Sequence, residues 1–317
     1  METIVIAIGG NALLCTDDAG CLIRQQDNID LCCDQVSELV ARGYRIVLTH
    51  GNGPQVGNIM LQNELAKQVI PENPLDICGA QTQGSLGYLL MQGLHNSFSK
   101  RGLMQPMAAL VSEVVVDEND EGFQNPTKFV GPFFSEQEAA ELVRKKKYVM
   151  KQDGSRGYRR VVPSPKPLEL VEEKAASDLL QDGYLVILAG GGGIPVVKKD
   201  QRLEGVEAVI DKDYTSALVA EKVCADKLII LTGVPKVAVN FNRPDERKLD
   251  VMSLAECDEY MREGQFPAGS MGPKVDAARK FVRATGKEAV ITSLCSLTEA
   301  MEDKSGTRIV PERRSHE

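Results

Sequence analysis

Apolar runs typical of buried strands alternate along the chain with stretches that have helical spacing. Thr3–Ile8 is a continuous run rich in β-branched residues, and Tyr184–Ala189 and Lys227–Leu231 have the same character. Helical spacing extends over about residues 26–42 and 214–224. This alternation predicts an α/β protein, a three-layer sandwich whose largely parallel central sheet lies between helices.

Short polar signals predict where some helices begin. Ser253 with Glu256, and Ser296 with Glu299, have the spacing of capping boxes. Asp213 is placed to cap the helix at 214–224. We therefore expect helices to start at each of these points.

The run 108–116 predicts one strand, and the segment 117–167 that follows it departs from the alternation. This segment carries five prolines, a basic cluster and short strand-like pieces. It is either a long decorated connection or a small subdomain that projects from the main sheet. Because long loops without function are uncommon, we favour a subdomain inserted in a domain of residues 1–310, with a polar tail at 311–317.

Composition excludes several classes of function. The formal charge of −8 argues against a nucleic-acid partner, and the longest apolar runs are too short to span a membrane. Eight cysteines form no C-x-x-C pair and there are three histidines, so we expect neither a disulfide framework nor a metal centre held by the protein. The simplest compartment is a reducing cytoplasm.

Three predicted strands run directly into glycines, at Gly9-Gly10-Asn11, Gly51-Asn52-Gly53 and Gly190–Gly193. Ligands of α/β sheets bind at the carboxyl ends of the strands, where glycine lets backbone N–H groups approach an anion. One such turn is more often a plain loop, but three favour a phosphate site. The P-loop motif is absent and neither glycine run fits G-x-G-x-x-G, so a dinucleotide-binding dehydrogenase is a weak alternative.

Three lysines next to Gly, Pro or Asp are candidates for phosphoryl transfer, which depends on converging positive charge. They are Lys128, Lys212 and Lys274, and Asp213 either orients two of them or only caps a helix. No general base stands out, since His50 could equally hydrogen-bond a loop. An acceptor that is already an anion has no proton to lose, so a kinase for an acyl or carbamoyl anion fits better than one for an alcohol.

Long motifs spread over residues 3–310 closely resemble those of the carbamate kinases, members of the amino-acid kinase family. They are Ala7-Ile8-Gly9-Gly10-Asn11-Ala12, His50-Gly51-Asn52-Gly53-Pro54-Gln55-Val56-Gly57, Asn125-Pro126-Thr127-Lys128, Val161-Val162-Pro163-Ser164-Pro165, Gly191-Gly192-Gly193-Ile194-Pro195, Ala208-Val209-Ile210-Asp211-Lys212-Asp213 and Gly269-Ser270-Met271 with Pro273-Lys274.

The resemblance implies the amino-acid kinase fold, a homodimer, and reversible phosphoryl transfer between ATP and carbamate with Mg²⁺. It implies catalytic roles for Lys212, Asp213, Lys274 and for Lys128, which would reach in from a mobile lid at 117–167. The residues that would bind carbamate and the phosphoryl group are Gly9, Gly10, Asn11, Gly51, Asn52 and Gly53. Those that would line the nucleotide pocket are Thr232, Gly233, Val234, Asn240, Phe241, Met271, Pro273 and Lys274.

Two other readings of the motifs stay open at this point. One is an amino-acid kinase with a bulkier acceptor, although no arginine for a distal carboxylate stands out in the motifs. The other is a catalytically silent sensor, which would not need all of Lys128, Lys212, Asp213 and Lys274.

Overall fold

The structure, a computed structural model, describes residues 1–9, 22–267 and 269–312, and in them eight strands form the central sheet. The order is β15-β17-β16-β12-β1-β2-β9-β3, and every neighbouring pair is parallel except β16 and β17. The predicted largely parallel sheet is therefore confirmed. Its strands are β1 (Thr3–Ile8), β2 (Arg45–His50), β3 (Met107–Ala109), β9 (Leu185–Ile187), β12 (Lys227–Thr232), β15 (Val251–Ser253), β16 (Glu288–Ser293) and β17 (Thr307–Val310).

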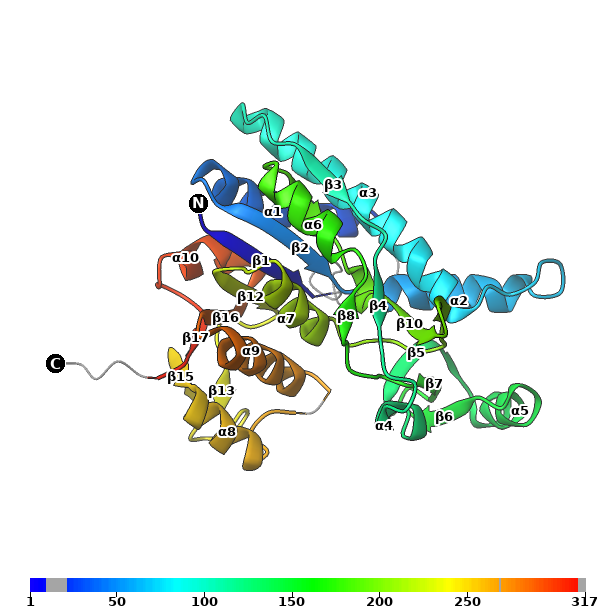
Figure 1. The fold of residues 1–317 in the computed structure, drawn as a ribbon. Helices are drawn as coiled ribbons and strands as arrows, with labels where there is room; N and C mark the ends of the chain where they lie inside the picture. Colours follow the sequence, from blue (N-terminus) through cyan, green and yellow to red (C-terminus); the bar gives the residue numbers. More distant parts are fainter. Residues whose placement is uncertain (10–21, 268, 313–317) are drawn as a thin grey trace.

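Alternation along β1 assigns the two faces of the sheet to two helix layers (Figure 1). Ile4 and Ile6 belong to one buried cluster, which contains apolar residues of α1 (Leu22–Ala41), α3 (Leu75–Arg101) and α10 (Leu297–Met301). Val5 and Ala7 belong to the other. That cluster takes in α6 (Glu173–Gln181), α7 (Lys212–Lys222), α8 (Leu254–Arg262) and α9 (Met271–Thr285). Because β1 is buried on both faces, nearly every side chain of the run is apolar.

The run 108–116 is not one strand, and that prediction is wrong. Its first part is β3, the edge of the central sheet, and its second is β4 (Glu113–Val115), which lies in a separate sheet ordered β11-β10-β4-β8. Gln83 of α3 binds the backbone between these two strands. Its side-chain nitrogen donates to the carbonyl of Ser112 (3.1 Å), and its side-chain oxygen accepts from the Ser112 N–H (2.7 Å). The other strands of this sheet are β8 (Glu169–Leu170), β10 (Ile194–Lys199) and β11 (Arg202–Gly205).

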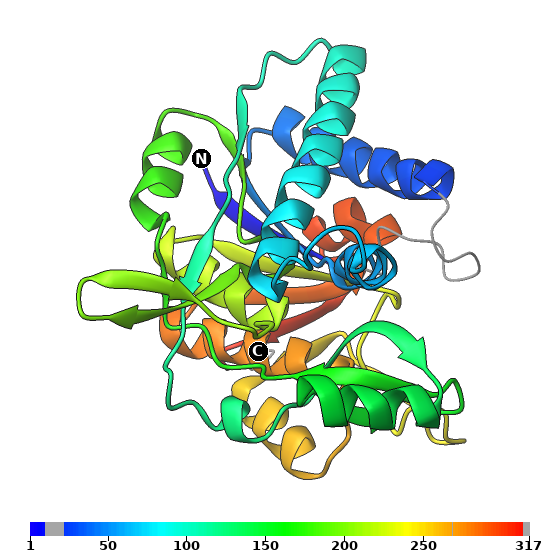
Figure 2. The same ribbon diagram turned by 90° about the vertical axis from the view of Figure 1, so that its right-hand side faces the viewer.

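A third sheet, antiparallel and ordered β5-β7-β6, extends beyond the ends of β1 and β2 toward which their arrows point (Figures 1 and 2). We call it the projecting sheet. Its apolar contact with the rest of the molecule is with α2 (Gly53–Ala66), where Val130 and Val162 share a small buried cluster with Val56. Its elements are β5 (Lys128–Phe134), β6 (Val149–Gln152) and β7 (Tyr158–Val162), with α4 (Glu121–Gln124) before it and α5 (Glu136–Lys146) within it.

Helix starts agree with the capping predictions at one of three places. Ser253 and Glu256 form the predicted capping box of α8. Ser296 does not cap α10, because a 3₁₀ turn precedes that helix and the Ser296 hydroxyl accepts from Ser293 (3.0 Å). Asp213 does not cap α7 either; the helix starts at Lys212 and its N-cap is Asp211.

The hairpin of β13 (Ala238–Val239) and β14 (Arg247–Lys248) completes the strands of the described residues. None of the helices in that part of the chain is long and apolar enough to cross a membrane.

Candidate active site

The strands β1, β2, β9 and β12 end at the same edge of the sheet, where the glycine turns meet. Gly51 follows β2, and its N–H donates to the carbonyl of Ile8 at the end of β1 (2.9 Å). Asn52 is the N-cap of α2, Gly53 is its first residue, and the Asn52 amide donates to Thr82 (2.8 Å). Gly9 ends the first described segment, whereas Gly10 and Asn11 lie outside the described residues.

The run Gly190–Gly193 lies against these turns so closely that it has no room for side chains. A Cβ on Gly191 would lie 2.2 Å from the Asn52 amide nitrogen, and one on Gly192 would lie 2.3 Å from the carbonyl oxygen of Ile210. Both glycines also have positive φ, 70° and 94°. Glycine is therefore required there by space and by backbone conformation.

Two lysines share one buried carboxylate at the carboxyl edge of the sheet. Lys212 Nζ lies 2.6 Å from Asp213 Oδ1, and Lys274 Nζ lies 2.8 Å from Asp213 Oδ2. The side chains are 12%, 5% and 16% exposed for Lys212, Asp213 and Lys274. This lysine cluster (Lys212, Asp213, Lys274) joins the first turns of α7 and α9 and carries a net positive charge.

The charges of the cluster depend on one another. Burial alone would raise the pKa of Asp213, but the ammonium groups of Lys212 and Lys274 hold it at about 2. Burial lowers the pKa of Lys212, and the neighbouring Lys274 adds to that effect, while Asp213 opposes it. The carboxylate therefore offsets the cost of burying the Lys212 ammonium and holds both ammonium groups close together.

Asp211 is a further residue of the candidate site, and the sequence analysis assigned it no role. Its side chain accepts the Asp213 N–H (3.0 Å) as the N-cap of α7, and its other oxygen lies 2.8 Å from Lys128 Nζ of β5. Asp211 thus links the projecting sheet to the helix that carries the lysine cluster. The available signal was an acidic residue directly before a helix, which is typical of an N-cap.

Buried hydroxyl groups fix α7 against the sheet and the glycine run. The hydroxyl groups of Ser216 and Thr49 of β2 are hydrogen-bonded to each other (2.6 Å). The Ser216 hydroxyl also lies 2.6 Å from the carbonyl oxygen of Lys212, to which it donates. Thr215 donates to the carbonyl of Gly192 (2.8 Å). The sequence analysis did not identify these supports, because serine and threonine inside a helix give no distinctive signal.

His50 is buried between the loops of the site. Its Nδ1 lies 3.1 Å from the carbonyl oxygen of Gly51, and Nε2 faces Gly190, where a Cβ would approach it to 2.5 Å. Burial, the largest effect, lowers the pKa of the imidazole to about 4. An imidazole with so low a pKa is a weak base, and its contacts with two backbone turns support the interpretation of His50 as a loop-stabilising residue rather than a general base.

Gln55, in the first turn of α2, was also missed by the sequence analysis. Both atoms of its amide are buried, and neither has a hydrogen-bond partner among the described residues. A buried polar group without a partner costs about 1–3 kcal/mol. Gln55 is therefore a candidate contact for a bound ligand.

The residues expected to line a nucleotide pocket fall in two places. Thr232 ends β12 at the carboxyl edge and Gly233 and Val234 follow it. Met271 and Pro273 lie in the first turn of α9 with Lys274. Asn240 and Phe241 lie in the loop between β13 and β14, where the Asn240 amide donates to Asp245 (2.8 Å) and Phe241 is 54% exposed. Among the described residues, no hydrogen bond or ion pair links that loop to the lysine cluster.

The arrangement is suited to holding an anion with several negative oxygens. The N-termini of α2 and α7 meet at the carboxyl edge, and helix N-termini favour negative charge. Two buried ammonium groups add positive charge where water is largely excluded, which strengthens their effect on charge that develops in a transition state.

Comparison with known proteins agrees with this geometry. The family model described as the amino acid kinase family matches residues 2–293. The carbamate kinase of Thermococcus kodakarensis is 46% identical over 98% of this chain and 100% of its own length, and the carbamate kinase-like protein YqeA of Escherichia coli is 46% identical over 97% and 99%. The structure of carbamate kinase from Giardia lamblia bound to AMP-PNP superposes with a TM-score of 0.93 at 44% identity, covering 98% of both chains. The chain therefore belongs to the amino acid kinase family and, within it, to the carbamate kinases and carbamate kinase-like proteins.

Proposed function

We propose that this protein is a carbamate kinase, which transfers a phosphoryl group between carbamoyl phosphate and ADP to give ATP and carbamate. The observation that carries the proposal is the lysine cluster at the carboxyl edge, with His50 held neutral against loops. Such a site suits an acceptor that is already an anion and needs no general base. Relatives named carbamate kinase, similar over nearly their full length, support the same reaction. The favoured direction in the cell would be ATP formation in a catabolic pathway.

In this proposal the cluster stabilises the transferring group. Lys212 and Lys274 neutralise the charge that spreads over its oxygens, and Asp213 orients both ammonium groups. The backbone N–H groups of the glycine turns hold carbamate and the phosphoryl group, with Asn52 supporting the turn at α2. The proposed binding residues are Gly9, Gly10, Asn11, Gly51, Asn52 and Gly53.

We propose that the nucleotide enters as its Mg²⁺ complex and lies along Thr232–Val234 and the first turn of α9. The two carboxylates nearest the proposed phosphate positions, Asp211 and Asp213, are already paired with lysines. Phosphate oxygens and water would therefore supply most of the ligands of Mg²⁺, as is usual for this ion. Asn240 and Phe241 would join the pocket only if the β13–β14 loop moves toward it.

The projecting sheet is proposed to act as a lid that carries Lys128 to the substrate. A cavity of about 300 Å³, lined in part by Met60, Val130 and Tyr148, lies between this sheet, α2 and the start of α3, beside their apolar contact. This incomplete packing supports movement of the sheet, and Lys128, 39% exposed, is paired only with Asp211 among the described residues. The boundaries 117–167 remain our prediction for the extent of the lid.

We propose a homodimer formed at the β3 edge. An open groove of about 540 Å³ runs along α3 and β3 and is lined by apolar groups that include Met91 and Met107. Tyr88 and Val111 on it are 61% and 58% exposed. A second copy would cover these side chains and the free edge of the strand. Light scattering should give twice the chain mass for the wild type and the single mass for Tyr88→Glu.

The free thiols of the described residues support a reducing compartment such as the cytoplasm. They include Cys32 and Cys33, which are buried and adjacent yet unbonded, and Cys224 and Cys295, which are exposed.

The decisive experiment follows ATP when the purified protein meets carbamoyl phosphate, ADP and Mg²⁺ in a coupled assay. We expect rapid ATP formation that stops when Mg²⁺ is chelated. A folded protein that binds ADP but forms no ATP would contradict the proposed reaction and point to another acceptor or a regulatory role.

A further inference from the structure

A second polar junction joins α7 and α9 beside the lysine cluster. Tyr214 directly follows Asp213 on α7, and Asp276 lies two residues after Lys274 on α9. Burial is the main cause that raises the pKa of Tyr214, and a hydrogen bond from its hydroxyl to the Asp276 carboxylate adds to the rise. Lys280 and then Tyr214 act to lower the pKa of Asp276, against the effect of burial. The two helices that supply the cluster are therefore tied together a second time, within two residues of it.

Asp276 is buried and pairs with two basic side chains of its own helix. It is 8% exposed, it lies 2.9 Å from Lys280 Nζ, and it also pairs with Arg279 Nη2. Lys280 returns to α7, because its ammonium lies 4.3 Å from the centre of the Tyr214 ring. The tyrosine is thus held at its hydroxyl by Asp276 and on its ring by Lys280.

Apolar packing holds the body of α9, where Val275, Ala277 and Ala278 are buried, but no side chain of the described residues caps its first turn. Its N-cap residue, Ser270, makes no capping hydrogen bond through its side chain. Lys274 reaches Asp213 through a long side chain whose position depends on where the helix lies. When a phosphoryl group competes with Asp213 for the ammonium of Lys274, the pairing that fixes it weakens at the moment its position matters.

We propose that Asp276 is a positioning residue for phosphoryl transfer: with Lys280 it clamps Tyr214 and so fixes α9, which keeps Lys274 aligned with Lys212 and Asp213. The inference rests on the proposed carbamate kinase reaction. It assigns no contact between Asp276 and substrate, so its loss should alter turnover more than nucleotide affinity.

Asp258 of α8 provides a matched control. It pairs with the same Arg279 and also with Arg283 (2.6 Å), but it lies on the side of α8 and makes no described contact with Tyr214 or the lysine cluster. Asp258→Asn therefore removes an ion pair of Arg279 from α9 while the contacts among Asp276, Lys280 and Tyr214 stay in place.

The test compares Asp276→Asn, Tyr214→Phe and Asp258→Asn in the ATP-forming assay, with thermal unfolding measured in parallel. We expect Asp276→Asn to lower kcat about 10-fold and Tyr214→Phe about 3-fold, with KM for ADP changed by less than about 2-fold. Asp258→Asn should keep the wild-type kcat. In a Lys274→Arg background a guanidinium replaces the ammonium that Asp276 is proposed to align. There Asp276→Asn should lower kcat by less than about a further 2-fold.

Each other result has a clear meaning. Losses that multiply in the Lys274→Arg background, or an equal loss of kcat in Asp258→Asn, would overturn the positioning role while leaving the kinase reaction intact. If Asp276→Asn fails to fold, Tyr214→Phe removes a single hydroxyl and decides by the same comparison. A wild-type protein that forms no ATP would overturn the proposed function, and this inference with it.

Discussion

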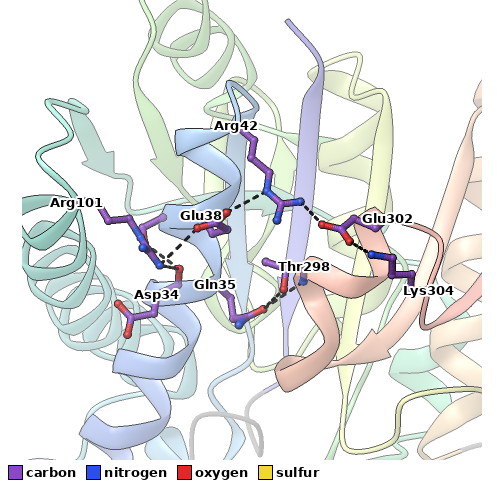
Figure 3. A network of polar contacts seen from close by, with 9 residues as sticks. Asp34, Gln35, Glu38, Arg42, Arg101, Thr298, Glu302 and Lys304 are labelled. Carbon is purple, nitrogen blue, oxygen red and sulfur yellow. Dashed lines mark hydrogen bonds and ion pairs between the residues drawn. The ribbon is translucent and has the colours of Figure 1, made fainter.

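Two networks of charged side chains connect helices in this molecule, and they differ most in their exposure to water. On the helix layer of α1, α3 and α10, Arg42 pairs with Glu38 (3.2 Å) and Glu302 (2.9 Å), and Glu302 with Lys304 (2.6 Å) (Figure 3). The side chains of Arg42 and Glu302 are 36% and 38% exposed. In the lysine cluster, on the other helix layer, the shared carboxylate is 5% exposed.

The difference shows what each network is suited to. Water and salt screen exposed pairs, so the Arg42 network contributes little to stability and can be altered freely. Burying two ammonium groups beside one carboxylate costs desolvation energy that a hydrophobic replacement would avoid. A network that is expensive and net positive at a ligand-binding edge is best explained by the chemistry it supports.

The largest expected effect comes from Asp213→Asn, which removes the buried carboxylate charge and keeps its size. The two ammonium groups would then repel each other, and Lys212 would lose its proton more readily. We expect kcat for ATP formation to fall by at least about 10³-fold. A variant that keeps more than about a tenth of the wild-type kcat would remove the distinction between the two networks.

Lys128→Ala should lower kcat about 100-fold while changing KM for ADP by less than about 3-fold, because Lys128 is expected to contact the transferring group and not the nucleoside. The matched control is Lys151→Ala on the same sheet, whose ammonium donates, within the described part of the chain, only to the carbonyl of Pro126 (2.8 Å). That control should keep the wild-type kcat. Equal losses in turnover and ADP binding for Lys128→Ala would contradict the lid role.

Burial at the candidate site also predicts that stability depends on pH through His50. The pKa is lowered from 6.5 to about 4 in the folded protein, so the unfolded chain binds the extra proton between these values. The free energy of unfolding should therefore fall as pH drops from 6.5 to 4, by about 3 kcal/mol from this residue. Chemical denaturation of His50→Gln over this range should show a shallower slope than the wild type; parallel curves would refute the assignment.

The smallest effect is expected from Glu302→Gln, in the exposed network. Its melting temperature should fall by less than about 2 °C at low ionic strength and match the wild type in 1 M NaCl, where the pairs are screened. The kcat should be unchanged. A large loss of stability that persists in high salt would show that exposure does not separate the two networks.

Local patterns in the sequence were sufficient for much of the fold. Thr3–Ile8 is β1 with the predicted bounds, and Lys227–Leu231 extends by one residue as β12. A strand buried on both faces leaves a continuous apolar run, and this signal does not depend on distant residues. The glycines at the strand ends and the three lysines were visible for the same reason.

Relations between distant residues could not be predicted. The division of 108–116 between two sheets depends on Gln83, a residue of α3 that no strand pattern includes. Lys128 meets Asp211 across 83 positions, and Lys274 meets Asp213 across 61. The sequence analysis left two roles open for Asp213. The structure shows that its neighbour Asp211 caps the helix, and it places Asp213 between the two lysines.

The close packing around Gly191 and Gly192 has a consequence for any mutational survey of this protein. Replacement by alanine, the mildest change at most positions, would drive a methyl group into Asn52 or into the backbone at Ile210. A survey would therefore rank these two positions with Lys274 among the least tolerant, although they contribute no side chain to the reaction. At Lys274 the survey would detect chemistry, whereas at the glycines it would detect the shape of the space that the chemistry occupies.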